Sequence, residues 1–241
     1  MAGASEGGAR RRIAFFDELR GLTIISMAAF HACYDLAYLY GLPMPWFTTG
    51  PFQDIWRDSI SWTFLALAGW MTSLSRNNAR RGLVYAAAAA AVFAATTVAA
   101  VDTPVSYGIL FCMAASTLLY AALAPLLRRI SPLAGLIACL ALFAITWGVP
   151  RAAYPVEHLA WLGFPSPSFA SGDYYPVIPF AFMYLAGSFA ATSFQGIAKG
   201  TYPTWMEADA IPPLSWMGRK SLVIYLAHQP VILLVLQLVL G

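Results

Sequence analysis

Charged residues are scarce in this chain of 241 residues. Asp, Glu, Lys and Arg together make up 10% of the sequence, whereas hydrophobic residues make up 60%. A soluble domain usually carries about 25% charged residues, so a chain of this composition would expose too much apolar surface in water. Apolar stretches of about 17–25 residues, each long enough to cross a bilayer, recur along the sequence. The composition excludes an ordinary soluble domain and predicts a membrane protein.

Cysteine is also rare. The three cysteines, Cys33, Cys112 and Cys139, all lie inside apolar segments. An odd number of cysteines without paired spacing argues against a disulfide framework and against a zinc site. We therefore expect small core residues at these positions and no bound metal.

A cleavable signal peptide is not expected. The first dozen residues are polar and end in the basic run Arg10 to Arg12. The apolar segment that follows is too long for the hydrophobic region of a signal peptide, so it should remain as a membrane anchor. We accordingly divide the chain into a polar, basic tail over 1–12 and a single transmembrane domain over 13–241.

The apolar segments predict an all-α transmembrane bundle. A backbone in lipid must satisfy its own hydrogen bonds, and the segments lack the alternation of barrel strands. Seven spans are expected: 20–41, 56–75, 82–101, 106–127, 133–150, 175–195 and 219–240.

The basic residues predict the orientation of this bundle. With seven spans, 12 of the 14 Lys and Arg residues fall on one side, and only Arg57 and Arg151 fall on the other. Because cytoplasmic loops carry an excess of Lys and Arg, the N-terminus should be cytoplasmic and the C-terminus periplasmic. The lipid bilayer is then one partner. No nucleic-acid partner is expected, and homo-oligomerisation is left open.

Two of the three histidines, His31 and His228, lie within the first and last apolar segments. Imidazole is costly in hydrocarbon, so such a histidine is a functional candidate. At a rise of ~1.5 Å per residue, His31 lies roughly 16 Å beyond Arg20, and His228 lies roughly 13 Å beyond Arg219. Both imidazoles should therefore lie at one depth, near the middle of a ~30 Å hydrocarbon core.

Polar residues accompany His31 in the first segment. Asp35 follows four residues later, on the same helix face, where a carboxylate can accept a hydrogen bond from the imidazole and orient it as a general base. Tyr34 can add a hydroxyl.

A polar stripe surrounds His228 in the last segment. Ser221, Tyr225 and His228 follow one another at spacings of four and three residues, and Gln229 adds an amide beside them. An alternative for both segments is a purely structural set of hydrogen bonds between helices.

Charged residues also stand at the ends of the segments. Asp17, Arg20, Arg219 and Lys220 lie at the predicted cytoplasmic side, where Arg offers a planar fork of donors for a phosphate. Alternatively, Asp17 and Arg20 form an ion pair at a helix end, and the basic residues anchor the segments at the cytoplasmic side.

On the predicted outer side, Asp58 and Asp173 either meet a polar substrate or cap helices. The loops over 41–55 and 151–174 on that side are rich in proline and aromatic residues. They predict either a substrate-facing surface or interfacial aromatics.

Five motifs, in consistent order from about residue 13 to 231, resemble those of the bacterial heparan-α-glucosaminide N-acetyltransferase-like family, a group of transmembrane acyltransferases. The first and last motifs are the most specific. The matching segments are 16–22 with 31–36, 64–69, 107–110, 173–179, and 218–222 with Tyr225 and 228–230. Phe111 differs from many members, which have a histidine there.

The resemblance implies acyl transfer in the bacterial inner membrane. Acyl-CoA is the donor from the cytoplasm, and an amino sugar or other glycan-type acceptor is modified at the membrane or periplasmic side. No histidine occurs between residues 41 and 56, where eukaryotic members place a catalytic histidine. The resemblance therefore implies His31 as general base or acyl carrier.

Further roles follow from the same resemblance. Asp35 orients His31, and His228 contacts the substrate or an intermediate. The implied CoA-binding residues are Asp17, Arg20, Arg219, Lys220 and Ser221, and the implied substrate contacts are Tyr34, Asp58, Asp173, Tyr225 and Gln229.

Two other functions fit the same residues. Two histidines at matched depth on different helices can serve as axial ligands of a haem. A transporter or flippase for a glycan or lipid intermediate is the second alternative, although no internal repeat supports it.

Overall fold

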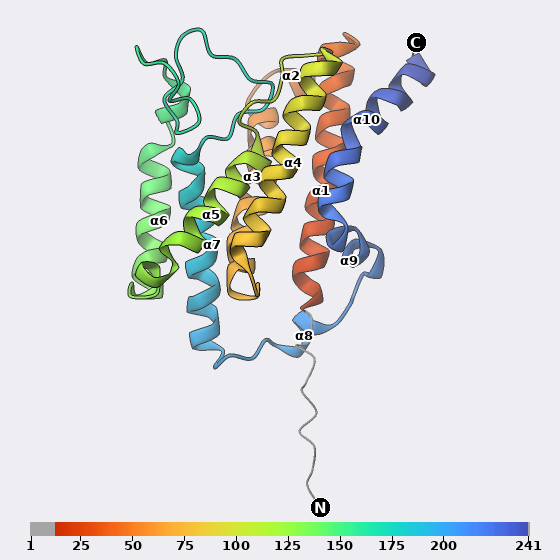
Figure 1. Cartoon of the computed structure of the whole chain (residues 1–241). Helices are drawn as coiled ribbons and strands as arrows, with labels where there is room; N and C mark the ends of the chain where they lie inside the picture. The colour runs from red at the N-terminus through yellow and green to blue at the C-terminus, as the bar shows by residue number, and fades with distance from the viewer. Residues whose placement is uncertain (1–12, 241) are drawn as a thin grey trace, which may run out of the picture. The chain divides into compact units, whose positions relative to one another are not determined.

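The computed structural model describes residues 13–240, and over this range the chain is helical with no strand. Only an isolated bridge joins Tyr107 to Tyr174. The expected polar tail over 1–12 lies outside the described residues. The helices in Figure 1 are α1 Ala14–Tyr34, α2 Pro45–Thr48, α3 Phe52–Trp70, α4 Asn78–Ala99, α5 Ile109–Leu127, α6 Pro132–Thr146, α7 Val177–Ile197, α8 Thr204–Glu207, α9 Pro212–Arg219 and α10 Ser221–Leu240.

Each expected span falls on a long helix, and the all-helical prediction is confirmed. Within residues 13–240, six helical segments are long and apolar enough to cross a membrane: Ala14–Leu39, Asn78–Ala99, Ile109–Leu127, Pro132–Arg151, Val177–Ile197 and Ser221–Leu240. The helix at the second expected span, α3, is not one of the six. Asp54, Arg57 and Asp58 lie in its first two turns and lower its hydropathy.

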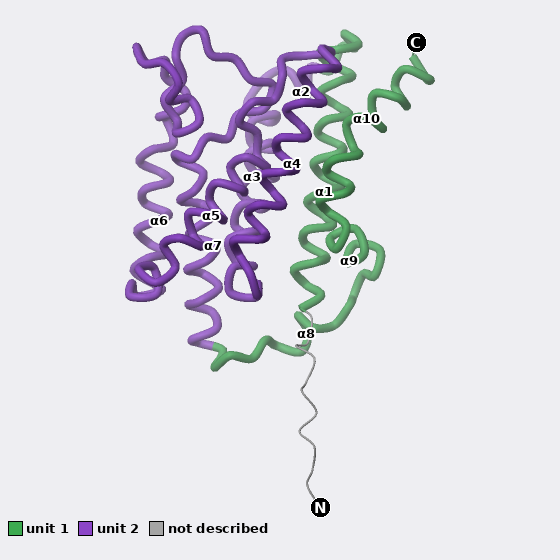
Figure 2. Tube along the Cα trace, viewed as in Figure 1, with its two compact units in different colours: residues 1–44, 198–241 green, residues 45–197 purple. Residues whose placement is uncertain are grey.

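The chain forms two compact units, which Figure 2 shows in different colours. The first, here called the terminal unit, combines residues 1–44 with 198–241. The second, the central unit, contains residues 45–197.

Glycines bring two helices of the central unit into close contact. A Cβ at Gly69 of α3 would collide with the backbone oxygen of Tyr184 on α7, and a Cβ at Gly187 would collide with that of Ala66. Small residues at such crossings let helices approach closely where lipid provides no hydrophobic driving force. The α3–α7 pair is therefore held by backbone-level packing.

Successive long helices of the central unit run in alternating directions (Figure 1). For example, Gly82 near the start of α4 packs on Leu118 in the middle of α5, whereas Thr96 near the end of α4 accepts a hydrogen bond from the Val105 N–H just before α5. The α3–α4 and α5–α6 connections therefore lie at the same end of this unit. That end carries five of the unit's seven basic residues: Arg76, Arg80, Arg81, Arg128 and Arg129.

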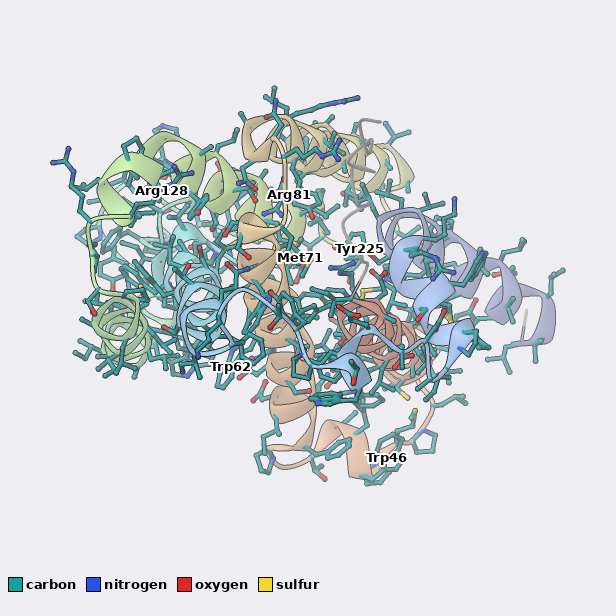
Figure 3. All side chains as sticks on the ribbon, turned by 90° about the horizontal axis from the view of Figure 1, so that it is seen from below. Trp46, Trp62, Met71, Arg81, Arg128 and Tyr225 are labelled. Atoms are coloured by element: carbon teal, nitrogen blue, oxygen red, sulfur yellow. The ribbon has the colours of Figure 1, made fainter. Side chains whose placement is uncertain are left out.

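A buried polar cluster joins four helices of the central unit. Arg81 of α4 (Figure 3) donates to the Tyr184 hydroxyl at 2.7 Å and to the Ala68 backbone oxygen at 2.9 Å. The same hydroxyl lies 2.8 Å from Thr117 Oγ1 on α5. Tyr184 is fully buried, so the cluster satisfies a hydroxyl that has no access to solvent, whereas Nε of Arg81 has no hydrogen-bond partner within residues 13–240.

The terminal unit is built on the contact between α1 and α9. A Cβ at Gly21 would collide with the Leu214 backbone oxygen, and a Cβ at Gly218 would collide with that of Asp17. Glu18 Oε1 accepts a hydrogen bond of 2.8 Å from the Ile211 N–H, at the start of α9. Because Ile211 has no side-chain cap of its own, Glu18 supplies an acceptor that this helix end lacks.

Candidate functional site

His31 and His228 meet inside the terminal unit. Their ring centroids are 4.8 Å apart, with an interplanar angle of 59°. His31 comes from α1, and His228 comes from α10. These helices run in the same direction, since Asp17 packs near Gly218 at one end and Asp35 meets Gln229 further along. The structure thus brings both candidate histidines into one site.

Asp35 lies where α1 changes its winding. The α-helix ends at Tyr34 and continues as a π-helical turn over Asp35–Leu39. Such turns occur frequently at functional sites. Asp35 is 4% exposed, and its Oδ2 accepts a 2.8 Å hydrogen bond from Nε2 of Gln229. The expected orientation of His31 by Asp35 stays a prediction.

Two buried polar atoms of α10 have no hydrogen-bond partner within residues 13–240. They are Nε2 of His228 and Oε1 of Gln229. Nδ1 of His228 interacts with the backbone oxygen of Tyr225, which leaves Nε2 as the ring nitrogen available for another group. An unpaired buried polar atom is costly, so a ligand with a hydroxyl or amine would satisfy what the protein leaves open.

One of the expected tyrosines contacts the histidine pair. The Tyr225 ring lies 5.4 Å from that of His228 (Tyr225 is labelled in Figure 3), and the Tyr34 ring packs at 4.7 Å on that of Tyr38. The three expected substrate contacts on these helices, Tyr34, Tyr225 and Gln229, therefore lie within three residues of a histidine in the sequence.

The expected CoA-binding residues lie where α1 and α10 begin. Arg20 donates to Asp17 at 3.1 Å, and both side chains are mostly buried, so part of the Arg20 charge is neutralised. Arg219 and Lys220 are exposed, and Ser221 is half-buried as the first residue of α10. The exposed cations of this set are therefore Arg219 and Lys220.

The other two expected substrate contacts, Asp58 and Asp173, belong to the central unit. Asp58 pairs with Arg57 at 3.6 Å. Asp173 Oδ2 accepts a 3.2 Å hydrogen bond from the Ile109 N–H at the start of α5, whose own N-terminal residue provides no cap. Burial raises the pKa of Asp173 to about 6, against the lowering effect of that N–H. Asp173 thus performs the helix-capping role that the sequence left open.

Sequence reasoning did not predict the partners of Gln229 and Glu18. Both are contacts between residues far apart in the chain. The one available signal for Glu18 was that α9 begins Ile211-Pro212-Pro213 without a capping side chain. Within residues 13–240, no group of three or more His, Cys, Asp or Glu side chains is arranged to hold a metal ion.

A comparison with family models places the chain among known proteins. The model described as heparan-alpha-glucosaminide N-acetyltransferase, catalytic, matches residues 12–230. No curated protein and no solved structure matches the chain. The family match covers both units and includes both histidines. Together with the six apolar helices, it indicates a multi-pass membrane protein, and the chain belongs to the heparan-alpha-glucosaminide N-acetyltransferase catalytic family.

Proposed function

We propose that this chain is a membrane acyltransferase. It moves an acetyl or other acyl group from cytosolic acyl-CoA to an amino sugar or other glycan-type acceptor at the membrane or periplasmic side. The observation that carries the proposal is the contact between His31 and His228 in a chain whose family is described by N-acetyl transfer.

His31 is the proposed general base. It takes a proton from the acceptor amine or hydroxyl as that group attacks the thioester carbonyl. The carbon–sulfur bond breaks, the CoA thiolate leaves, and the proton passes from the imidazole to the thiolate. In the alternative order, His31 first accepts the acyl group on a ring nitrogen and then transfers it.

The neighbours of His31 position the reacting groups. Asp35 orients the imidazole, and its own carboxylate is held by Gln229. His228 Nε2 is buried without a partner and contacts the acceptor or the intermediate. Tyr34, Tyr225 and Gln229 are further proposed acceptor contacts in the terminal unit. Asp58 and Asp173 are proposed as separate substrate contacts within the central unit.

The donor binds at the ends of α1 and α10 where these helices begin. Exposed Arg219 and Lys220 attract the CoA phosphates, because hydrogen bonds from a cation to a phosphate are among the strongest available. Arg20 contributes its remaining donors while paired with Asp17, and Ser221 adds a hydroxyl.

We propose that this donor side is cytoplasmic. The distribution of Lys and Arg along the sequence, with 12 of 14 on one side of seven spans, supports an N-terminus in the cytoplasm and a C-terminus in the periplasm of a bacterial inner membrane. We also propose that α3 is a seventh span and that residues 13–241 act as one enzyme domain.

The geometry disfavours a haem between the two histidines. Metal–imidazole bonds of about 2 Å on each side of a metal would separate the ring centroids by more than about 6 Å. The observed separation is 4.8 Å. No comparable observation favours a transporter.

The test uses the full chain in lipid nanodiscs. We expect CoA to raise the unfolding temperature, and release of CoA from acetyl-CoA to require an amino-sugar acceptor. His31→Ala should lower the transfer rate about 10²- to 10⁴-fold, the usual contribution of a general base, without abolishing CoA binding. Arg20→Ala and Lys220→Ala should weaken CoA binding.

Arg128→Ala is the matched control, since Arg128 is an exposed arginine of the central unit (Figure 3). It should leave CoA binding unchanged. A folded protein with no CoA-dependent thermal shift refutes the proposal. Flux of a glycan or lipid intermediate across the membrane without consumption of acetyl-CoA supports a transporter instead.

A further inference from the structure

The two ends of the central unit differ in charge. Five of its arginines lie at the end formed by the α3–α4 and α5–α6 connections, here called the arginine end: Arg76, Arg80, Arg81, Arg128 and Arg129. The carboxylates of residues 45–197 lie at the opposite end, at the start of α3 and in the α4–α5 and α6–α7 connections: Asp54, Asp58, Asp102, Glu157 and Asp173. The arginine end therefore combines five positive charges with no negative charge from its own unit.

The arginines of this end are not neutralised by ion pairs within residues 45–197. The ion pairs of that range join Arg57 to Asp54 at 2.9 Å and to Asp58 at 3.6 Å, at the opposite end. Four of the five side chains are exposed, and only Arg81 is half-buried. Because like charges repel one another, an anion bound among them would lower the electrostatic energy of this end.

Arg81 strengthens the demand for an anion. Its Nη2 donates to the Tyr184 hydroxyl and to the Ala68 backbone oxygen, which are both neutral acceptors. Its Nε is buried without a hydrogen-bond partner within residues 13–240. A guanidinium that is partly removed from water without a counter-charge is costly, so the charge of Arg81 (Figure 3) is compensated best by an anion that binds from outside.

Exposed apolar side chains adjoin the arginines on all three neighbouring helices. Leu83 follows Arg81 on α4 and is 61% exposed, Leu126 precedes Arg128 on α5 and is 57% exposed, and Leu133 at the start of α6 is 61% exposed. All three helices belong to candidate membrane spans. A soluble anion would use only the arginines, whereas an amphiphile with an anionic head group and apolar chains would use both kinds of surface.

We infer that the arginine end binds the head group of an anionic membrane phospholipid. The exposed arginines donate to the phosphate oxygens, since guanidinium groups match phosphate geometry, and Arg81 adds its charge. The acyl chains lie along the exposed apolar side chains of α4, α5 and α6. Basic clusters beside membrane-spanning helices recognise anionic head groups in this way. This binding needs neither acyl-CoA nor acyl transfer, so it stands or falls apart from the proposed function.

The experiment measures lipid binding to the full chain in a neutral detergent by native mass spectrometry. The probes are dioleoyl phosphatidylglycerol, which is anionic, and dioleoyl phosphatidylcholine, which has the same acyl chains and no net charge. We expect phosphatidylglycerol to bind at least about tenfold more tightly. Arg80→Gln and Arg128→Gln should each weaken phosphatidylglycerol about fivefold, the usual effect of one arginine near a lipid surface, and leave phosphatidylcholine unchanged.

Arg57→Gln is the matched control. It removes an arginine that is already paired with carboxylates at the opposite end of the unit, so it should leave the dissociation constants of both lipids unchanged. The tested variants change exposed side chains and keep the buried contacts of Arg81 with Tyr184. Inorganic phosphate and CoA, each at the concentration of the lipid, should not displace phosphatidylglycerol, because they lack its acyl chains.

Three results would overturn the inference. The first is equal binding of the two lipids. The second is binding of phosphatidylglycerol that neither Arg80→Gln nor Arg128→Gln weakens, or that Arg57→Gln weakens as much, since the effect would then come from net charge alone. The third is displacement of the lipid by phosphate or CoA, which would assign the arginine end to a soluble phosphate compound.

Discussion

Replacing Gln229 by leucine removes the amide that holds Asp35. In the structure, Nε2 of Gln229 donates to Oδ2 of Asp35 at 2.8 Å, and Asp35 is 4% exposed. Leucine fills a similar volume but cannot donate. The loss of one hydrogen bond to a buried acceptor costs about 1–3 kcal/mol. Since about 1.4 kcal/mol changes a rate tenfold, a cost felt only in the transition state lowers kcat/KM by about 5- to 150-fold.

The assay is acyl transfer in nanodiscs, with kcat and KM measured separately and thermal unfolding measured in parallel. We expect Gln229→Leu to lower kcat with little change in the KM for acyl-CoA. Gln195→Leu is the matched control, because Gln195 Nε2 donates to Ser73 Oγ at 3.1 Å in the central unit. That variant should lower the unfolding temperature and leave kcat unchanged.

A second substitution, Gln229→Glu, distinguishes positioning from simple packing. It places a second carboxyl against Asp35, and two carboxyls in contact share a proton because both cannot ionise together. The transfer rate should then acquire a pH dependence additional to that of the general base His31. Loss of even about 1 kcal/mol of transition-state stabilisation would lower kcat/KM about fivefold. If Gln229→Leu keeps kcat/KM within about twofold of wild type, this amide does not position Asp35 in the reaction.

Three further predictions concern stability, each measured by thermal unfolding. Burial raises the pKa of Asp173 to about 6, so the folded state favours the protonated carboxyl and the protein loses stability as pH rises through about 6. Asp173→Asn should remove this pH dependence of the unfolding temperature. An unchanged pH dependence in that variant would contradict the assignment. Gly218→Ala drives a Cβ into the Asp17 backbone oxygen and should cost about 1–3 kcal/mol, whereas Gly196→Ala, whose Cβ meets nothing within 4 Å, should cost nothing. Tyr184→Phe removes a buried hydroxyl that binds both an arginine and a threonine and should cost about 1–3 kcal/mol; full retention of stability would show that the cluster does not hold α4, α5 and α7 together.

The positions of the long helices could be predicted from the sequence with small errors at their ends. The expected first span began at residue 20, whereas α1 begins at Ala14. The extra turn and a half carries Asp17 and Glu18, whose polar side chains bind Arg20 and the start of α9. A hydropathy pattern detects the part of a helix that suits lipid, not the polar turn that extends beyond it.

The partners of the site residues were less predictable. Spacing along α1 placed Asp35 one turn from His31 and suggested a bond between them. That bond stays a prediction. A hydrogen bond to Asp35 that spacing along α1 could not reveal comes from Gln229, which adjoins His228 on another helix. A π-helical turn also begins at Asp35, and no pattern of residue types predicts such a turn.

By itself, the sequence determined that this protein lies in a lipid bilayer and that its secondary structure is helical. Too few charges and too many long apolar segments leave only helices in lipid, and histidines within those helices mark a candidate site because imidazole is costly there. Only the tertiary structure decided that His31 meets His228 and that Gln229 meets Asp35. Those contacts depend on which faces α1 and α10 turn toward each other. That choice follows from packing of whole helices, including the Gly21 and Gly218 crossings of α1 and α9, between segments at opposite ends of the chain.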